Sequence, residues 1–150
     1  MLESIESFLN DLFDGGDRVA LDDDQVRIAS AALLVHCARS DGRQSASEEG
    51  RLRTILSSHF ALSDAEADQV VTTAAAQERD AVDIHRFTRV LHQRLDRVGR
   101  QQMIGWLWEV AQADGSIGPD EHRMVSLAAQ LLDVETRDSV ALRQAAVRGA

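Results

Sequence analysis

Two short acidic segments hold the side chains best suited to chemistry in this sequence. Asp41 is followed seven residues later by Glu48, and Asp114 is followed at the same spacing by Glu121. Carboxylate oxygens are the ligands that hard cations such as Ca²⁺ and Mg²⁺ prefer, and a complete coordination shell needs about six to eight ligands, water included. One segment alone offers too few oxygens, and its spacing is too short for an EF-hand loop. We therefore predict one weak divalent-cation site shared by Asp41, Glu48, Asp114 and Glu121.

The same four residues also have a purely structural interpretation. Each Asp precedes a glycine, Gly42 or Gly115, and glycine ends helices because it readily adopts a left-handed conformation. Each Glu stands where the third residue of a helix accepts a hydrogen bond from a backbone amide and complements the helix dipole. On sequence alone, the cation site and the structural loops both stay open.

The two segments belong to an internal repeat with an offset of 73 residues. Each follows a stretch that is apolar nearly all round: residues 28–38, with only Ser30 and His36 polar, and residues 103–110, with only Glu109 polar. A helix of that composition is buried on every side. The repeat therefore predicts two helix–loop–helix units related by a pseudo-twofold axis.

The rest of the chain predicts an all-α fold of seven to eight helices. Proline occurs once, and no stretch alternates apolar and polar residues as a half-buried strand does. We expect a single domain over 1–150 with its core at about 22–135, preceded by an amphipathic helix within 1–16. The expected helices cover about 2–13, 22–40, 45–60, 63–77, 82–95, 98–113 and 119–132, with an eighth over 137–147.

Charge and hydropathy exclude several classes of partner. The chain has 25 acidic and 16 basic residues, all of the basic ones Arg, for a net charge of −9. Without a basic stripe we expect no nucleic-acid binding and no attraction to anionic membranes. The longest apolar run, residues 31–35, is far too short to span a bilayer, so we expect no direct membrane insertion. The amino terminus is acidic and lacks the features of a secretory signal, so we expect a cytoplasmic protein.

Motifs of nucleophilic catalysis are absent from the sequence. It has no Gly-x-Ser-x-Gly elbow, no phosphate-binding glycine loop and no His-Glu-x-x-His. The single cysteine, Cys37, lies next to His36 on a buried helix, where neighbouring residues face different ways. We expect a core histidine and an inert thiol. Trp106 and Trp108 also face different ways; we expect both to be buried, and the alternative places one in the core and the other at a groove or interface.

The segment from Leu107 to Gly115, together with a Glu seven residues after its Asp, resembles the TerB-like family, named for tellurite resistance protein B. Arg100 and the Phe87-Thr88 pair fit the same pattern, and the resemblance covers about residues 22–135. Two features depart from the family: Ser40 replaces the usual Ala, and residues 126–127 stand where many relatives carry a basic pair.

The resemblance implies an all-helical domain of about seven helices that acts in stress response or metal-linked signalling, with cations bound by the acidic loops. No enzymatic activity is established for the family. We therefore predict a non-enzymatic domain that binds a protein partner, with a homodimer also open. The alternatives are a metal-dependent, hydrolase-like enzyme that uses the paired carboxylates, and a helical bundle that binds a small molecule or lipid.

Overall fold

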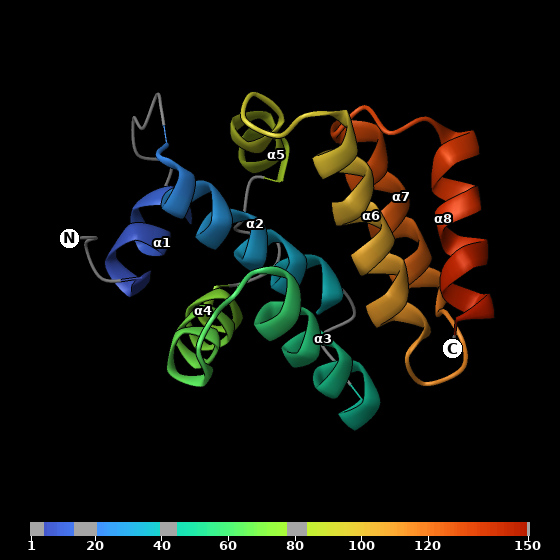
Figure 1. Ribbon diagram of the computed structural model, residues 1–150, viewed down its shortest axis with the longest axis horizontal. Coiled ribbons are helices and arrows are strands. Elements are labelled where there is room, and N and C mark those ends of the chain that lie inside the picture. The colour runs from blue at the N-terminus through green and yellow to red at the C-terminus, as the bar shows by residue number, and fades with distance from the viewer. Residues whose placement is uncertain (1–4, 14–20, 40–44, 78–83, 150) are drawn as a thin grey trace.

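The computed structural model describes residues 5–13, 21–39, 45–77 and 84–149. Within these ranges the chain forms eight α-helices and no strand, which confirms the predicted all-α fold (Figure 1). The helices are α1 (Ile5–Phe13), α2 (Asp23–Ala38), α3 (Ala46–His59), α4 (Asp64–Ala76), α5 (Ile84–His92), α6 (Arg97–Gln112), α7 (Pro119–Leu131) and α8 (Thr136–Arg148).

Helix α2 is the centre of the fold. Every residue from Ile28 to Ala38 is buried, as the nearly uniform apolar composition predicts. The helix packs against α1, α3, α4, α5, α6 and α7. His36 and Cys37 are both buried on it, so the predicted core histidine and buried thiol are confirmed in position.

Helix α6 has the same role in the second half of the chain. It packs against α2, α3, α7 and α8 and buries residues such as Met103, Ile104 and Leu107. Helix α2 thus contacts both α6 and α7, and α6 contacts both α2 and α3. A pseudo-twofold relation between α2–α3 and α6–α7 requires this pattern of contacts.

Helix starts follow the capping residues of the sequence. The Ser45 and Ser63 hydroxyls accept hydrogen bonds from the backbone amides of Glu48 and Glu66, and those carboxylates accept bonds from the serine amides in return. Pro119 is the first residue of α7, as expected for a residue without an amide donor.

One predicted helix end was wrong. Helix α5 ends at His92 rather than at Leu95, because Asp96 is extended and accepts a hydrogen bond from the Gly99 amide to begin α6. Helix α8 starts at Thr136, within one residue of its predicted start.

Trp108 is buried, whereas Trp106 is half-buried against His59 and Phe60, so the expected burial of both indoles was wrong for Trp106. Although α2 is apolar, it has only 16 residues. No helix in the described ranges combines the length and the hydropathy needed to cross a membrane.

Candidate functional site

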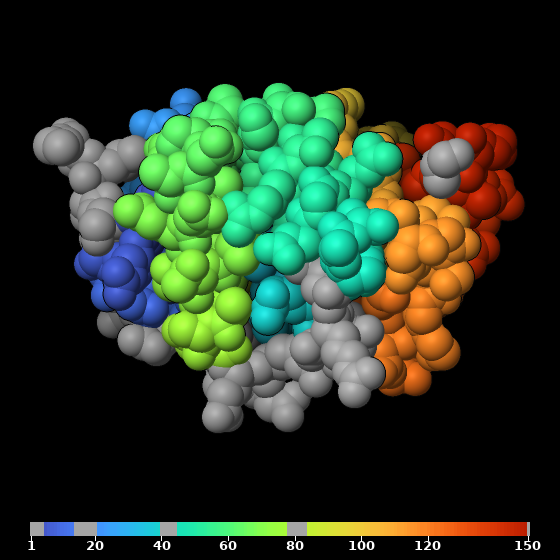
Figure 2. All heavy atoms as spheres, turned by 90° about the horizontal axis from the view of Figure 1, so that it is seen from below, coloured from blue at the N-terminus to red at the C-terminus, as the bar shows by residue number. Residues whose placement is uncertain are grey.

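The two acidic segments lie on the same side of the molecule. The start of α3 and the loop between α6 and α7 are both at the lower edge of Figure 1. In the view from below, the start of α3 (teal) lies beside the orange segment that contains this loop and the start of α7 (Figure 2). Of the four predicted ligands, Asp41 lies outside the described residues, and Glu48, Asp114 and Glu121 lie within them.

Glu48 is the third residue of α3, and its side chain is bound to the start of its own helix. Its Oε1 accepts a hydrogen bond from the Ser45 amide at 3.0 Å, while the Ser45 hydroxyl accepts one from the Glu48 amide at 3.0 Å. The residue is only 5% exposed. The predicted capping role is therefore present, and the carboxylate is also buried.

Glu121 has the equivalent place in α7. Its Oε1 accepts a hydrogen bond from the Gly118 amide at 3.2 Å, and the residue is 9% exposed. Because the residue before α7 is a glycine, no side chain accepts a bond from the Glu121 amide in return.

Asp114 lies in the loop between α6 and α7, where it is exposed. Its Oδ1 accepts a hydrogen bond from the Ser116 amide at 3.2 Å. The next residue, Gly115, has φ +98°, a conformation that favours glycine. The Asp-Gly pair thus forms the helix-ending turn that the structural interpretation predicts.

Glu66 shows that a Glu residue can cap a helix without being fully buried. It is the third residue of α4 and makes the same pair of hydrogen bonds with Ser63, which lower the pKa of its carboxyl group. Yet Glu66 is only partly buried, whereas Glu48 and Glu121 are almost fully buried. Capping therefore explains their hydrogen bonds and leaves their burial unexplained.

A complete metal-ligand set is not assembled by the described residues. Within them, no three His, Cys, Asp or Glu side chains are grouped so that they could hold a metal ion. Glu48, Asp114 and Glu121 each direct one oxygen to a nearby backbone amide. A shared cation would therefore need further ligands, with Asp41, backbone carbonyls and water as the sources at hand, and the four-residue site stays a prediction.

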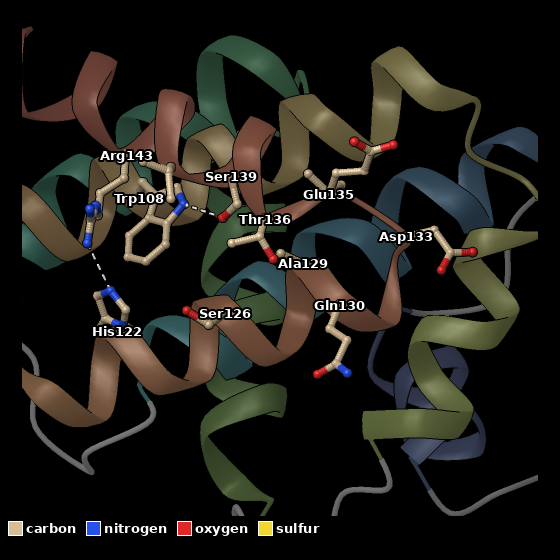
Figure 3. A pocket seen from close by; sticks show the side chains of 12 residues that line it. Trp108, His122, Ser126, Ala129, Gln130, Asp133, Glu135, Thr136, Ser139 and Arg143 are labelled. Carbon is tan, nitrogen blue, oxygen red and sulfur yellow. Dashed lines mark hydrogen bonds between the residues drawn. The ribbon is translucent and has the colours of Figure 1, made fainter.

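A groove of about 720 Å³ lies between α7 and α8, and one end of it is at His122, the residue after Glu121 (Figure 3). Trp108 of α6 is at its base, and its indole Nε1 donates a hydrogen bond to Ser139 Oγ at 3.2 Å. At one end, Arg143 Nη1 lies 2.9 Å from His122 Nε2. Arg143 is the donor in this contact, because a guanidinium has no acceptor atom.

Sequence reasoning did not identify this groove. Its only signals were the alternative in which one tryptophan lines a groove and the departure from the family at Ser126, which lies on its α7 side. Among the described residues, the lining consists of Trp108, His122, Ser126, Ala129, Gln130, Asp133, Val134, Glu135, Thr136, Ser139, Val140 and Arg143.

Comparison with known proteins identifies one family. A family model described as "Tellurite resistance protein TerB" matches residues 27–144, which is most of the chain. No curated protein and no solved structure matches the chain.

Proposed function

Because this chain belongs to the tellurite resistance protein TerB family, we propose that it is a non-enzymatic, cytoplasmic protein-interaction domain that acts in a stress or metal-resistance response. Its acidic helix–loop–helix end binds a divalent cation, Ca²⁺ or Mg²⁺, through Glu48, Asp114 and Glu121, with Asp41 as the fourth ligand. The bound cation adjusts the surface that the protein partner contacts.

The burial of Glu48 and Glu121 is the observation that supports this proposal. An ionised carboxylate loses solvation when it is buried, and a nearby cation offsets that loss. Within the residues that the structure describes, no ion pair joins Glu48 to an Arg or His side chain. A divalent ion shared with the neighbouring acidic loop would supply the missing positive charge.

The other two functions receive less support. A hydrolase that uses paired carboxylates needs them around an open pocket, but none of the three described ligands, Glu48, Asp114 and Glu121, lines the groove between α7 and α8. A lipid carrier needs an apolar cavity between the two central helices, but α2 and α6 pack directly against each other.

Replacement of Glu by Gln tests the cation without removing the cap. Gln25 already has this role in α2, where its Oε1 accepts a hydrogen bond from the Asp22 amide at 3.0 Å. Glu48→Gln and Glu121→Gln therefore keep the capping oxygen and remove only the charge. Glu66→Gln is the matched control, because it makes the same change at a capping site that is not buried.

Thermal unfolding with millimolar Ca²⁺, Mg²⁺ or Mn²⁺ is the measurement, compared with NaCl at equal ionic strength. A cation that binds only the folded state at a hundredfold excess over Kd stabilises it by about 2.7 kcal/mol, which raises the melting temperature by several degrees. We expect this shift in the wild type and in Glu66→Gln, and its loss in Glu48→Gln and Glu121→Gln. Equal responses of all four proteins to the divalent ions would refute the cation site.

A further inference from the structure

Helix α8 is less buried than the other helices of the described chain. It has 13 residues, and Ser139 is its only buried one, whereas each of the other seven helices buries at least three. Val147, near its end, is 48% exposed, and it is one of two large apolar residues that are exposed. Since most helical stability in proteins comes from packing of one face, α8 has a face available for a further contact.

The groove beside α8 carries opposite charges at its two ends. Arg143 lies at one end, and Asp133 and Glu135 lie at the other, where they also contact His92 and Arg137 of their own chain (Figure 3). The middle is neutral and is formed by short side chains such as Ser126. From His122 in α7 to Asp133, two residues after the end of α7, the eleven steps along the chain correspond to a length of about 16 Å.

We propose that a second copy of this chain binds this face, with α8 of each copy lying antiparallel over the groove of the other. The axis of the resulting twofold dimer passes near Ser139. Glu135 precedes Ser139 by four residues and Arg143 follows it by four. Antiparallel pairing about Ser139 therefore brings Arg143 of each copy to Glu135 of the partner subunit.

A twofold interface uses the same surface of both copies, so each residue must meet its complement on that one surface. A groove that is positive at one end and negative at the other meets this condition when the two copies are antiparallel. A partner with one sign of charge along its length would match only half of the groove.

The distribution of charge also favours a second copy. The chain carries a net charge of −9, which opposes self-association through most of its surface. Residues 119–148, however, contain five acidic and four basic side chains. The α7–α8 face is therefore nearly neutral, and it is a part of the surface where two copies can approach without strong repulsion.

The size of the face sets the strength of the contact. Two helices of 13 residues are each about 20 Å long and about 10 Å across, so together they present a face of about 20 Å by 20 Å. About 400 Å² from each copy, or about 800 Å² in total, is below the range of stable specific interfaces, so we expect a weak dimer that forms only at high concentration.

Sedimentation velocity of the full chain, from about 1 µM to about 1 mM, tests the dimer over the range where a weak contact is measurable. We expect a shift from monomer to dimer for the wild type. Arg143→Glu or Glu135→Arg places like charges opposite each other and raises the Kd about tenfold or more. The double variant Arg143→Glu/Glu135→Arg restores the opposite charges and the dimer. Arg123→Glu is the control, since Arg123 is an exposed arginine of α7 outside the groove lining.

Each other outcome overturns the proposal. A wild type that stays monomeric at the highest concentration excludes the dimer. A dimer that both single variants leave intact uses a different face. Failure of the double variant to recover excludes the antiparallel pairing of Arg143 with Glu135. Far-ultraviolet circular dichroism and the melting temperature of each variant separate loss of the dimer from loss of the fold.

Discussion

The thiol of Cys37 provides a quantitative test of how completely α2 is enclosed. Cys37 is 2% exposed, and burial raises its pKa from 9.0 to about 12. At pH 8, a thiol with the ordinary pKa is about one-tenth thiolate, whereas the shifted pKa leaves about one part in ten thousand. Because the thiolate is the reacting species, we expect native Cys37 to react with the disulfide reagent DTNB about a thousandfold more slowly than an exposed cysteine.

The assay compares DTNB reaction of the native protein with reaction of the protein unfolded in guanidinium chloride, with Cys37→Ser as the blank. Rapid, stoichiometric reaction of the native protein at pH 8 would refute the enclosure of α2. The raised pKa of Cys37 also makes the stability of the protein depend on pH. Below pH 9 the thiol is neutral in both the folded and the unfolded protein, so stability is unchanged. Between pH 9 and about pH 12 only the unfolded protein ionises its thiol, so stability falls as the pH rises. The fall in melting temperature from pH 8 to pH 10 should therefore be smaller in Cys37→Ser than in the wild type.

Further substitutions test the packing of α6 and its contact with α8, all by denaturant unfolding monitored with circular dichroism. Leu107→Ala should lower the free energy of unfolding by about 2–5 kcal/mol, because Leu107 is 2% exposed in the core. Arg137→Ala, on the exposed start of α8, should change the free energy of unfolding by less than about 0.5 kcal/mol. A near-neutral Leu107→Ala would mean that α6 is not central. Ser139→Ala should lower the free energy of unfolding by about 1–3 kcal/mol, because it leaves the buried Trp108 indole N–H without its acceptor. Ser139→Thr keeps the hydroxyl and should recover part of this loss.

The helices could be predicted from sequence because their signals are local. Serine caps with a Glu three residues later located the starts of α3 and α4, and Pro119 located the start of α7. The apolar run from residue 28 to residue 38 predicted a buried central helix, since no face of it could remain in water. The end of α5 was predicted less well, because the apolar pattern continues to Leu95 while the cap at Asp96 ends the helix earlier.

The α7–α8 groove could not be predicted, because its contacts join residues that only the packing of three helices brings together. Trp108 meets Ser139, which is 31 residues later, and His122 meets Arg143, which is 21 residues later. Neither pair has a spacing that corresponds to one helix face. In addition, α8 has a sequence that is polar and rich in alanine, so its periodicity indicates a helix but not the surface on which it lies.

The repeated carboxylates show which of their properties follow from residue spacing and which depend on tertiary packing. The offset of 73 residues placed Glu48 and Glu121 at the same position of two helices, and both cap those helices. By the same local rule Glu66 is their equivalent, and it makes the same bonds. Glu121 lacks only the returned side-chain bond, because a glycine precedes α7. The surroundings also differ: α3 begins beside the segment that contains the start of α7, and α4 begins elsewhere (Figures 1 and 2). A role of Glu48 and Glu121 beyond capping therefore depends on their burial, which Glu66 lacks. The Glu→Gln substitutions at the three positions test the effect of that burial, because they keep the capping oxygen and remove the charge.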